Sequence, residues 1–334
     1  MKCAPAAALR RIAKPLAIVA VLAAALTTPV AASAAPASGI TGVRPLGGQQ
    51  FQITVYSAAM NRQIPLWISR AAGGAGPTLY LLNGVDGGEG GGDWTGRTDV
   101  ASFFAGKNVN VVVPLAGRAS YYTDWEHDDP ILGRNQWATF FTRELPPLLN
   151  SLFPTTGRNA VAGVSMSAGS ALDLAIHAPG FFQAAASFSG CTQTASAAGQ
   201  AYVYSQIALF GGNAANMWGP PGDPAWADHD PTLHADRLRG TAVYVAAGTG
   251  APGPHEALTA PGIGGNAGAL ADRAVVGGVM ESVVHQCTQT LAASLRAANV
   301  PATIALNPVG THSWPYWQDD LHNAWPMIAT AIGA

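Results

Sequence analysis

Short apolar runs alternate with longer amphipathic segments along most of this chain. Residues 51–56 and 64–68 are two such runs joined by a polar turn, so the pattern predicts a pair of strands. Residues 78–82 and 109–113 are apolar at nearly every position, which is typical of strands buried on both faces of a sheet. Further strands are expected at residues 160–163, 184–188, 241–247 and 302–306.

Helical segments separate several of these strands. The predicted helices are residues 137–149, 168–177, 278–298 and 317–332. Pro146 and Pro147 are expected to kink or end the first helix, because proline lacks the N–H group that a helix interior needs.

Three segments show little periodicity. Residues 35–45 are rich in Ala, Pro, Ser and Gly and are expected to form a flexible lead-in. Residues 195–237 are expected to form an irregular insertion over the sheet, and residues 248–268 a long loop. The remaining alternation of strands and helices predicts an α/β domain whose mostly parallel sheet is covered by helices on both faces.

The N-terminal segment has the three parts of a secretory signal peptide. Basic residues come first, an apolar stretch at 16–26 follows, and Ala32-Ser33-Ala34 suits signal peptidase. The apolar stretch is shorter than the roughly 20 residues that span a bilayer, so an uncleaved anchor is the less favoured alternative. We therefore expect a signal peptide at 1–34, a single domain at 35–334, and secretion to the medium or the cell envelope.

The charge of the chain argues against one class of partner. There are 17 basic and 19 acidic residues, which gives a formal net charge of −2. Cleavage after residue 34 would remove four basic and no acidic residues and change this charge to −6. A mildly acidic chain without a basic cluster argues against binding nucleic acid. No second apolar run is long enough to span a membrane, so no transmembrane segment is expected in the mature protein.

Two cysteines, Cys191 and Cys287, would remain after cleavage. In an exported protein such a pair favours a disulfide bond, and two buried free thiols are the alternative. Neither cysteine belongs to a C-x-x-C motif, so zinc or redox chemistry at these positions has no support. A bridge would fix the predicted helix 278–298 to the segment after the strand 184–188.

A cluster of small residues joins a predicted strand to a predicted helix. It reads Gly163-Val164-Ser165-Met166-Ser167-Ala168-Gly169. A serine in this setting is typical of the nucleophile elbow, a sharp turn that exposes the hydroxyl group. The full pattern is G-x-S-x-G, and Ser167 replaces the second glycine with another small residue. Small residues are common in this chain, so the motif needs partners elsewhere before it indicates catalysis.

A serine hydroxyl needs a base, and a third group to orient that base, before it becomes a nucleophile. His312 is the best base because its loop follows the last predicted strand, and a structural histidine is the alternative. In the order Ser, Asp/Glu, His, the acid lies between Ser165 and His312. Glu281 leads because a carboxylate among apolar neighbours needs a partner, although it also suits the helix dipole. Asp272 and Glu256 compete with it.

Acyl transfer also needs N–H groups that stabilise an oxyanion. Met166, directly after the serine, is expected to supply one of them. Val85, in the glycine-rich loop 84–92 after a buried strand, is expected to supply the other. This loop lacks the G-x-G-x-x-G and G-K-[ST] motifs of nucleotide sites. The layout predicts an α/β-hydrolase fold, and its serine chemistry requires no metal and no organic cofactor.

Several short segments, in order from about residue 45 to the C-terminus, match one known family. They are Leu81-Leu82-Asn83-Gly84, Tyr121-Tyr122-Thr123-Asp124-Trp125, Phe141-Thr142-Arg143-Glu144, residues 163–172, Met217-Trp218-Gly219-Pro220, Asp223-Pro224-Ala225-Trp226 and residues 310–317. On these segments the chain resembles the actinobacterial mycolyltransferases of the antigen 85 type, and more closely their relatives outside that subgroup.

The resemblance implies an α/β-hydrolase with Ser165 as nucleophile, Glu281 as acid and His312 as base. It also implies Met166 and Val85 as oxyanion donors. The implied reaction moves a mycoloyl chain from trehalose monomycolate through an acyl-serine intermediate. The acceptor is a second trehalose monomycolate, which gives trehalose dimycolate, or cell-wall arabinogalactan. Trehalose mycolates and arabinogalactan are therefore the expected partners.

The chain departs from the antigen 85 pattern in several places. Asn83 stands in place of an aspartate and Asp86 in place of an arginine, at two positions that contact the sugar in the family. Together with Trp314 they are the candidate substrate-binding residues. The reactive cysteine of the family is absent at Ala246-Ala247, and the pair Cys191–Cys287 differs from the disulfide of that subgroup.

Two other functions remain open for the same residues. A triad and an oxyanion hole do not choose between a sugar hydroxyl and water, so a secreted carboxylester hydrolase is one alternative. A non-catalytic sugar- or matrix-binding protein is another, because the family includes a member without the serine. The presence of Ser165, Glu281 and His312 argues against that reading. Several tryptophans suit sugar stacking as well as ordinary core packing: those at 94, 125, 218, 226, 314 and 317.

Overall fold

A nine-stranded sheet forms the centre of the protein. The computed structural model describes residues 1–4 and 37–334. The predicted signal peptide, apart from its first four residues, lies outside the described part of the chain. Residues Pro36–Ala334 make up one compact unit. Within the described ranges, none of the helices has both the length and the apolar character that crossing a membrane requires.

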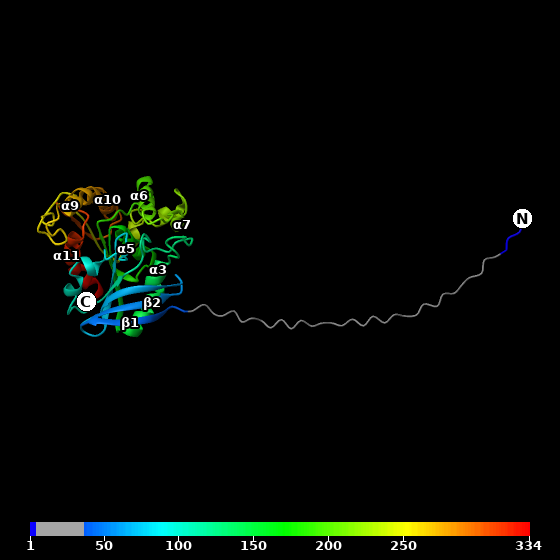
Figure 1. Cartoon of the computed structure of the whole chain (residues 1–334), viewed down its shortest axis with the longest axis horizontal. Helices are drawn as coiled ribbons and strands as arrows, with labels where there is room; N and C mark the ends of the chain where they lie inside the picture. The colour runs from blue at the N-terminus through cyan, green and yellow to red at the C-terminus, as the bar shows by residue number, and fades with distance from the viewer. Residues whose placement is uncertain (5–36) are drawn as a thin grey trace. The chain divides into compact units, whose positions relative to one another are not determined.

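The sheet has an antiparallel part followed by a parallel part. Its strand order is β1-β2-β3-β5-β4-β6-β7-β8-β9, and the pairs from β5 through β9 are all parallel. Strands β1 and β2, drawn in blue in Figure 1, lie side by side at one edge of the sheet. The strands are β1 (Gly39–Gly47), β2 (Gln50–Ser57), β3 (Arg62–Ser69), β4 (Gly76–Leu82), β5 (Asn110–Pro114), β6 (Thr155–Val164), β7 (Phe182–Phe188), β8 (Ala242–Ala247) and β9 (Ala302–Leu306).

Helical segments connect most of the parallel strands. Three of these segments are short π or 3₁₀ stretches, labelled η. The helices are α1 (Trp94–Arg97), α2 (Val100–Phe103), α3 (Trp137–Thr139), η1 (Phe140–Glu144), α4 (Leu145–Leu152), α5 (Met166–His177), α6 (Ala197–Ala208), α7 (Ala215–Trp218), α8 (Pro224–Asp228), η2 (Ala235–Leu238), α9 (Ala267–Ala271), η3 (Asp272–Val276), α10 (Gly277–Ala297) and α11 (Trp314–Ile332).

Two hydrophobic clusters lie on opposite faces of the sheet, because successive side chains of a strand point to opposite sides. Tyr80 of β4 belongs to one cluster, and its neighbours Leu79 and Leu81 belong to the other. Residues of α4, α5 and α10 complete the first cluster, and residues of α1, α2 and α11 complete the second. The helices therefore cover both faces, as the sequence pattern predicts.

The carboxyl ends of the parallel strands meet at one edge of the sheet, where ligands bind in open α/β folds. The register joins the last residues of neighbouring strands: Leu82 with Gly163, Val164 with Phe188, Phe188 with Ala246, and Ala247 with Leu306. The segments that follow β4, β6, β7, β8 and β9 therefore start side by side. The three predicted triad residues all lie in these segments: Ser165 after β6, Glu281 on α10 after β8, and His312 after β9.

The strands and helices expected from the sequence are confirmed, with shifts at their ends. The helix predicted at 137–149 does form, and it passes through the π stretch η1 before α4. Pro146 does not end it, because this residue lies in the first turn of α4, where a missing N–H group costs little.

Two expectations for irregular segments are wrong. Residues 35–45 do not form a flexible lead-in throughout, because Gly39–Gly47 is strand β1 and pairs with β2 along most of its length. Residues 195–237 are not mainly irregular, because they contain the twelve-residue helix α6 and three shorter helical segments. In both places contacts with the rest of the fold supply an order that local composition does not reveal.

Candidate active site

Ser165 lies at the turn between β6 and α5. Its backbone has φ +54°, a conformation that is uncommon for a residue with a side chain. Its N–H donates to the carbonyl oxygen of Phe188 at 3.0 Å, which fixes the turn against the neighbouring strand. A Cβ added to Gly163 would lie 2.1 Å from the carbonyl oxygen of Ser167, so only glycine fits there. These features are those of a nucleophile elbow.

His312 faces the serine from the loop between β9 and α11. Its Nε2 lies 2.8 Å from Ser165 Oγ, and its Nδ1 lies 2.8 Å from Glu281 Oε2. The tautomer that satisfies both contacts carries its proton on Nδ1 and accepts the serine hydroxyl at Nε2. The main-chain N–H of His312 donates to the carbonyl oxygen of Gly277 at 3.0 Å, which holds the loop against the start of α10.

Glu281 is almost completely buried, with 1% of its surface exposed. Its second oxygen, Oε1, accepts hydrogen bonds from Ser189 Oγ at 2.7 Å and from the N–H of Gly248 at 2.8 Å. Both carboxylate oxygens are therefore engaged, which offsets the cost of burying the charge. No local motif marks Ser189 or Gly248 in the sequence, because each acts through its position at the end of a strand.

The two competing acids occupy other places. Glu256 accepts hydrogen bonds from the hydroxyl groups of Thr311 (2.8 Å) and Tyr316 (2.6 Å). It therefore holds the two sides of the loop that carries His312. Asp272 lies among the residues that line the adjacent pocket. Neither carboxylate hydrogen-bonds to the histidine in the described structure.

Two main-chain N–H groups near Ser165 are the candidates for an oxyanion hole. Met166 is the first residue of α5, where N–H groups have no partner within the helix. A Cβ added to Gly84 would lie 3.8 Å from Ser165 Cβ, so the loop that carries Val85 runs directly past the serine. The carbonyl oxygen of Val85 accepts from the N–H of Ala119 at 2.8 Å, which fixes this part of the loop. Among the described residues, neither candidate N–H donates a hydrogen bond.

The three candidate substrate-binding residues separate in the structure. Asn83 is fully buried, donates to the carbonyl oxygen of Pro114 at 2.6 Å and accepts from the N–H of Trp94 at 3.3 Å. Its side chain anchors the loop after β4 and is not among the residues that line the pocket beside His312. This placement argues against the predicted sugar contact. Asp86 accepts from the N–H of Gly88 at 3.1 Å, and burial raises the pKa of its carboxyl group.

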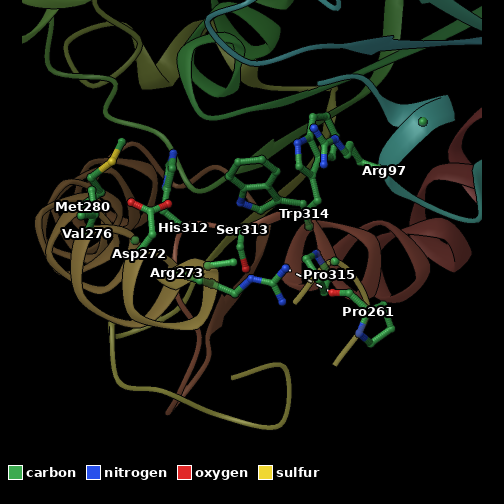
Figure 2. A pocket seen from close by; sticks show the side chains of 15 residues that line it. Arg97, Pro261, Asp272, Arg273, Val276, Met280, His312, Ser313, Trp314 and Pro315 are labelled. Carbon is green, nitrogen blue, oxygen red and sulfur yellow. Dashed lines mark hydrogen bonds between the residues drawn. The ribbon is translucent and has the colours of Figure 1, made fainter. Parts of the chain in front are cut away.

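A pocket of about 580 Å³ opens beside the histidine. Figure 2 shows His312, Ser313 and Trp314 on one part of its wall, together with residues of η3 and the start of α10. Of the three candidate substrate-binding residues, only Trp314 lines this pocket. The wall also carries the charged side chains Arg97, Asp272 and Arg273.

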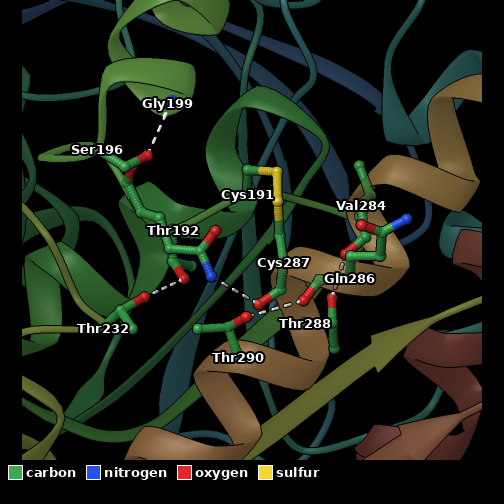
Figure 3. The surroundings of a disulfide bond; sticks show 11 residues. Cys191, Thr192, Ser196, Gly199, Thr232, Val284, Gln286, Cys287, Thr288 and Thr290 are labelled. Atoms are coloured by element: carbon green, nitrogen blue, oxygen red, sulfur yellow. Dashed lines mark hydrogen bonds between the residues drawn. A yellow bond between two sulfur atoms is a disulfide. The ribbon is translucent and has the colours of Figure 1, made fainter.

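A disulfide bond joins Cys191 to Cys287, so the predicted pairing is confirmed. The bridge links the segment after β7 to α10, across 96 positions of sequence (Figure 3). Close to it, Gln193 Nε2 donates to the carbonyl oxygen of Cys287 at 3.3 Å. Because α10 also carries Glu281, the bridge helps to hold the carboxylate in register with the sheet.

A second buried carboxyl group lies on α11. The pKa of Asp320 is raised to about 7, mainly by burial and in smaller part by the charges of Glu281 and Asp319, while a hydrogen bond from Asn307 lowers it. That hydrogen bond runs from Asn307 Nδ2 to Asp320 Oδ1 at 3.1 Å. A lone aspartate on an amphipathic helix carries no signal of its burial, so Asp320 could not be predicted from the sequence.

Comparisons with known proteins agree with this geometry. The model of the family called Esterase matches residues 57–328. The chain is 32% identical over 293 residues to diacylglycerol acyltransferase/mycolyltransferase Ag85B of Mycobacterium leprae, covering 84% of each chain. It is 32% identical over 304 residues to Ag85A of Mycobacterium tuberculosis, covering 84% of this chain and 81% of the relative.

A solved structure shares the arrangement of the whole domain. The crystal structure of MPT51 (FbpC1) from Mycobacterium tuberculosis superposes with a TM-score of 0.69 and 27% sequence identity. The match covers 86% of this chain and 100% of that chain. The predicted α/β-hydrolase fold is thereby confirmed. The chain belongs to the esterase family and, within it, to the group of the antigen 85 mycolyltransferases.

Proposed function

We propose that this chain is a serine acyltransferase that moves a mycoloyl chain from trehalose monomycolate to a second trehalose monomycolate or to arabinogalactan. The observation that carries the proposal is the hydrogen-bonded series Ser165, His312 and Glu281, beside two N–H groups that have no partner in the described part of the chain. The relatives are diacylglycerol acyltransferase/mycolyltransferases, which supports acyl transfer as the reaction class.

The first half of the reaction forms an acyl-enzyme. Ser165 Oγ attacks the ester carbonyl of the donor while His312 Nε2 takes the hydroxyl proton. The N–H groups of Met166 and Val85 stabilise the negative oxygen of the tetrahedral intermediate, at about 3 kcal/mol for each such donor. Glu281 stabilises the imidazolium that forms. The intermediate collapses, the sugar oxygen takes the proton from His312, and trehalose leaves.

The second half returns the enzyme to its starting state. A hydroxyl group of the acceptor gives its proton to His312 Nε2 and attacks the acyl carbonyl. A second tetrahedral intermediate breaks the bond to Ser165 Oγ, which regains the proton. If water takes the place of the acceptor, the same steps give a free acid, and the enzyme is then a carboxylester hydrolase.

The pocket beside His312 supports a sugar in the site. Its polar groups from Arg97, Asp272 and Arg273 suit hydroxyl groups, and Trp314 offers an aromatic face. Next to it, four valines at 275, 276, 279 and 283 are between 51% and 63% exposed. An exposed apolar strip beside a polar pocket suits a substrate that has a sugar at one end and a long acyl chain at the other.

Export is also part of the proposal. The segment 1–34 has the composition of a signal peptide, and a disulfide bond is typical of an oxidising compartment. The protein is therefore proposed to act in the cell envelope or the medium, with trehalose mycolates and arabinogalactan as its substrates.

The test uses purified protein, trehalose monomycolate and a Ser165→Ala control, with products resolved by thin-layer chromatography and mass. Trehalose dimycolate formed by the wild type alone supports the proposal. Free mycolic acid as the only product, even when arabinan is added, supports the hydrolase instead. Equal turnover by Ser165→Ala would refute the role of the serine in either reaction.

A further inference from the structure

A second group of reactive side chains lies on α5, the helix that begins at Met166. Asp173 and His177 occupy positions i and i+4 of this helix and share one face, and His229 reaches them from the end of α8. One ligand atom from each of the three lies within 4.8 Å of the others. Among residues 1–4 and 37–334, no other cluster of three such side chains is found.

The contacts centre on the carboxylate of Asp173. Its Oδ2 lies 2.8 Å from His229 Nδ1, and its Oδ1 lies 3.0 Å from His177 Nδ1. Asp173 is 8% exposed, and Oδ1 has no hydrogen bond of acceptable geometry although it is fully enclosed. The imidazole Nδ1 of His177 instead lies 3.1 Å from the main-chain oxygen of Asp173. A buried carboxylate oxygen without a hydrogen bond is costly unless another group satisfies it.

We infer that Asp173, His177 and His229 bind one divalent metal ion of the zinc type. Two imidazole nitrogens and one carboxylate are a common ligand set for zinc, with bonds of about 2.0–2.2 Å. Tetrahedral ligands at that distance lie about 3.4 Å apart, so the 2.8 and 3.0 Å spacings between the carboxylate and the two imidazole nitrogens would open by roughly 0.4–0.6 Å on binding. The ion would satisfy Oδ1 and balance the buried charge.

The surroundings fit a metal site beyond its three ligands. Asp228 Oδ2 lies 3.3 Å from His177 Nε2, the position from which a carboxylate orients a metal-binding imidazole. The ring of Trp218 stacks on His229 with centroids 4.6 Å apart and planes 7° apart, which fixes the plane of the second imidazole. All three ligands line a hollow of about 220 Å³, so a fourth position is open to water or a small ligand.

The ion would join two parts of the chain that are far apart in sequence. It connects α5 to the segment after α8 in the insertion. Met166, Asp173 and His229 also line one small hollow between these parts. Metal binding is therefore expected to stabilise the domain without taking part in acyl transfer, and it does not depend on the proposed function.

The experiment titrates chelator-treated, dialysed protein with Zn²⁺ against a chromogenic chelator. One Zn²⁺ per chain is expected. His229→Gln and Asp173→Asn are expected to bind at least roughly 100-fold more weakly, and Asp228→Asn roughly 10- to 100-fold more weakly. His322→Gln is the matched control, because His322 pairs with Asp99 at 2.9 Å and no third ligand joins them among the described residues.

Ser165→Ala separates this site from the proposed active site, since it should bind Zn²⁺ as the wild type does. Zn²⁺ should also raise the melting temperature of the wild type and of His322→Gln, but not that of His229→Gln. Circular dichroism without metal shows whether each variant has folded. If Asp173→Asn does not fold, His229→Gln alone provides the comparison with the wild type. No binding to the wild type at micromolar Zn²⁺, or equal binding to a folded His229→Gln, would overturn the inference.

Discussion

The hydroxyl group of Ser189 donates a 2.7 Å hydrogen bond to Glu281 Oε1, the oxygen of the carboxylate that does not face His312. Ser189 follows β7 directly and has φ +53°, so a strained turn carries the donor to the carboxylate. The disulfide bond joins the same two segments, since Cys191 lies two residues after Ser189 and Cys287 six residues after Glu281. The segment after β7 and the helix that carries Glu281 are thus joined both by a hydrogen bond and by a disulfide bond.

Replacing Ser189 by alanine should lower kcat by about tenfold. A hydrogen bond to a charged group contributes about 1.5 kcal/mol or more, and about 1.4 kcal/mol corresponds to a factor of ten in rate. Ser282→Ala is the control. Ser282 lies next to Glu281 on α10, but its hydroxyl group donates to the main-chain oxygen of Val279 and not to the carboxylate. Its kcat should stay within about twofold of wild type. Steady-state kinetics that give Ser189→Ala a wild-type kcat would refute the orienting role.

Removing the disulfide bond should destabilise the domain markedly. A bridge across 96 positions restricts the unfolded chain by about 4–5 kcal/mol in the chain-entropy model. The double variant Cys191→Ser, Cys287→Ser should therefore unfold at a lower denaturant concentration than the oxidised wild type. Reductant should lower the wild-type midpoint and leave the double variant unchanged. A reduced wild type that keeps its oxidised midpoint, with both thiols labelled, would contradict the prediction.

The contribution of Asp320 to the stability of the wild type should fall as pH rises from about 4 to about 7. The pKa of Asp320 is about 7 in the folded protein, against an ordinary value of 3.8, because the side chain is buried. The folded state thus keeps a proton that the unfolded state loses in this range. Each pKa unit corresponds to about 1.4 kcal/mol, so the effect is at most about 4 kcal/mol.

Asp320→Asn should remove this dependence. Its melting temperature should exceed that of wild type at pH 8, and the difference should shrink at pH 4. Asp236→Asn is a control, because that carboxylate is exposed and pairs only with Arg239 at 3.7 Å. Differential scanning calorimetry at both pH values measures these melting temperatures. If Asp320→Asn differs from the wild type by the same amount at pH 4 and pH 8, the pKa of Asp320 is not raised.

A methyl group at Gly163 should damage the elbow. The added Cβ would lie 2.1 Å from the carbonyl oxygen of Ser167, so the backbone around Ser165 has to move. We expect Gly163→Ala to lose at least roughly 1–3 kcal/mol of stability and most of its activity. Gly39→Ala is the matched control, since nothing lies within 4 Å of its added Cβ. Wild-type activity and melting temperature in Gly163→Ala would contradict the tight turn.

The elements that position the site could be predicted because their sequence signals are local. Ser165 stands between an apolar run and a helical segment, and His312 follows the last apolar run. Parallel strands with helical connections bring such positions together at one edge of a sheet, so a sequence separation of 147 does not obscure the pair. The disulfide pairing could also be predicted, since a chain cleaved after residue 34 would contain only Cys191 and Cys287.

Other features depend on contacts that the sequence does not display. Strand β1 has a composition typical of a loop, and its pairing with β2 orders it. Asn83 was expected to contact a sugar, but the turn after β4 directs its amide to Pro114. Ser189 and Gly248 act through backbone placement at strand ends. His229 meets Asp173 only because the insertion folds back onto α5.

The most direct test of the central claim is the mass of the protein during turnover. Wild-type protein is mixed with trehalose monomycolate, quenched, digested and examined by mass spectrometry. We expect a mycoloyl adduct on the peptide that contains Ser165. Added free trehalose should decrease this adduct, because trehalose monomycolate is re-formed. Turnover without any adduct on Ser165, or an adduct that only water removes, would contradict a serine acyltransferase.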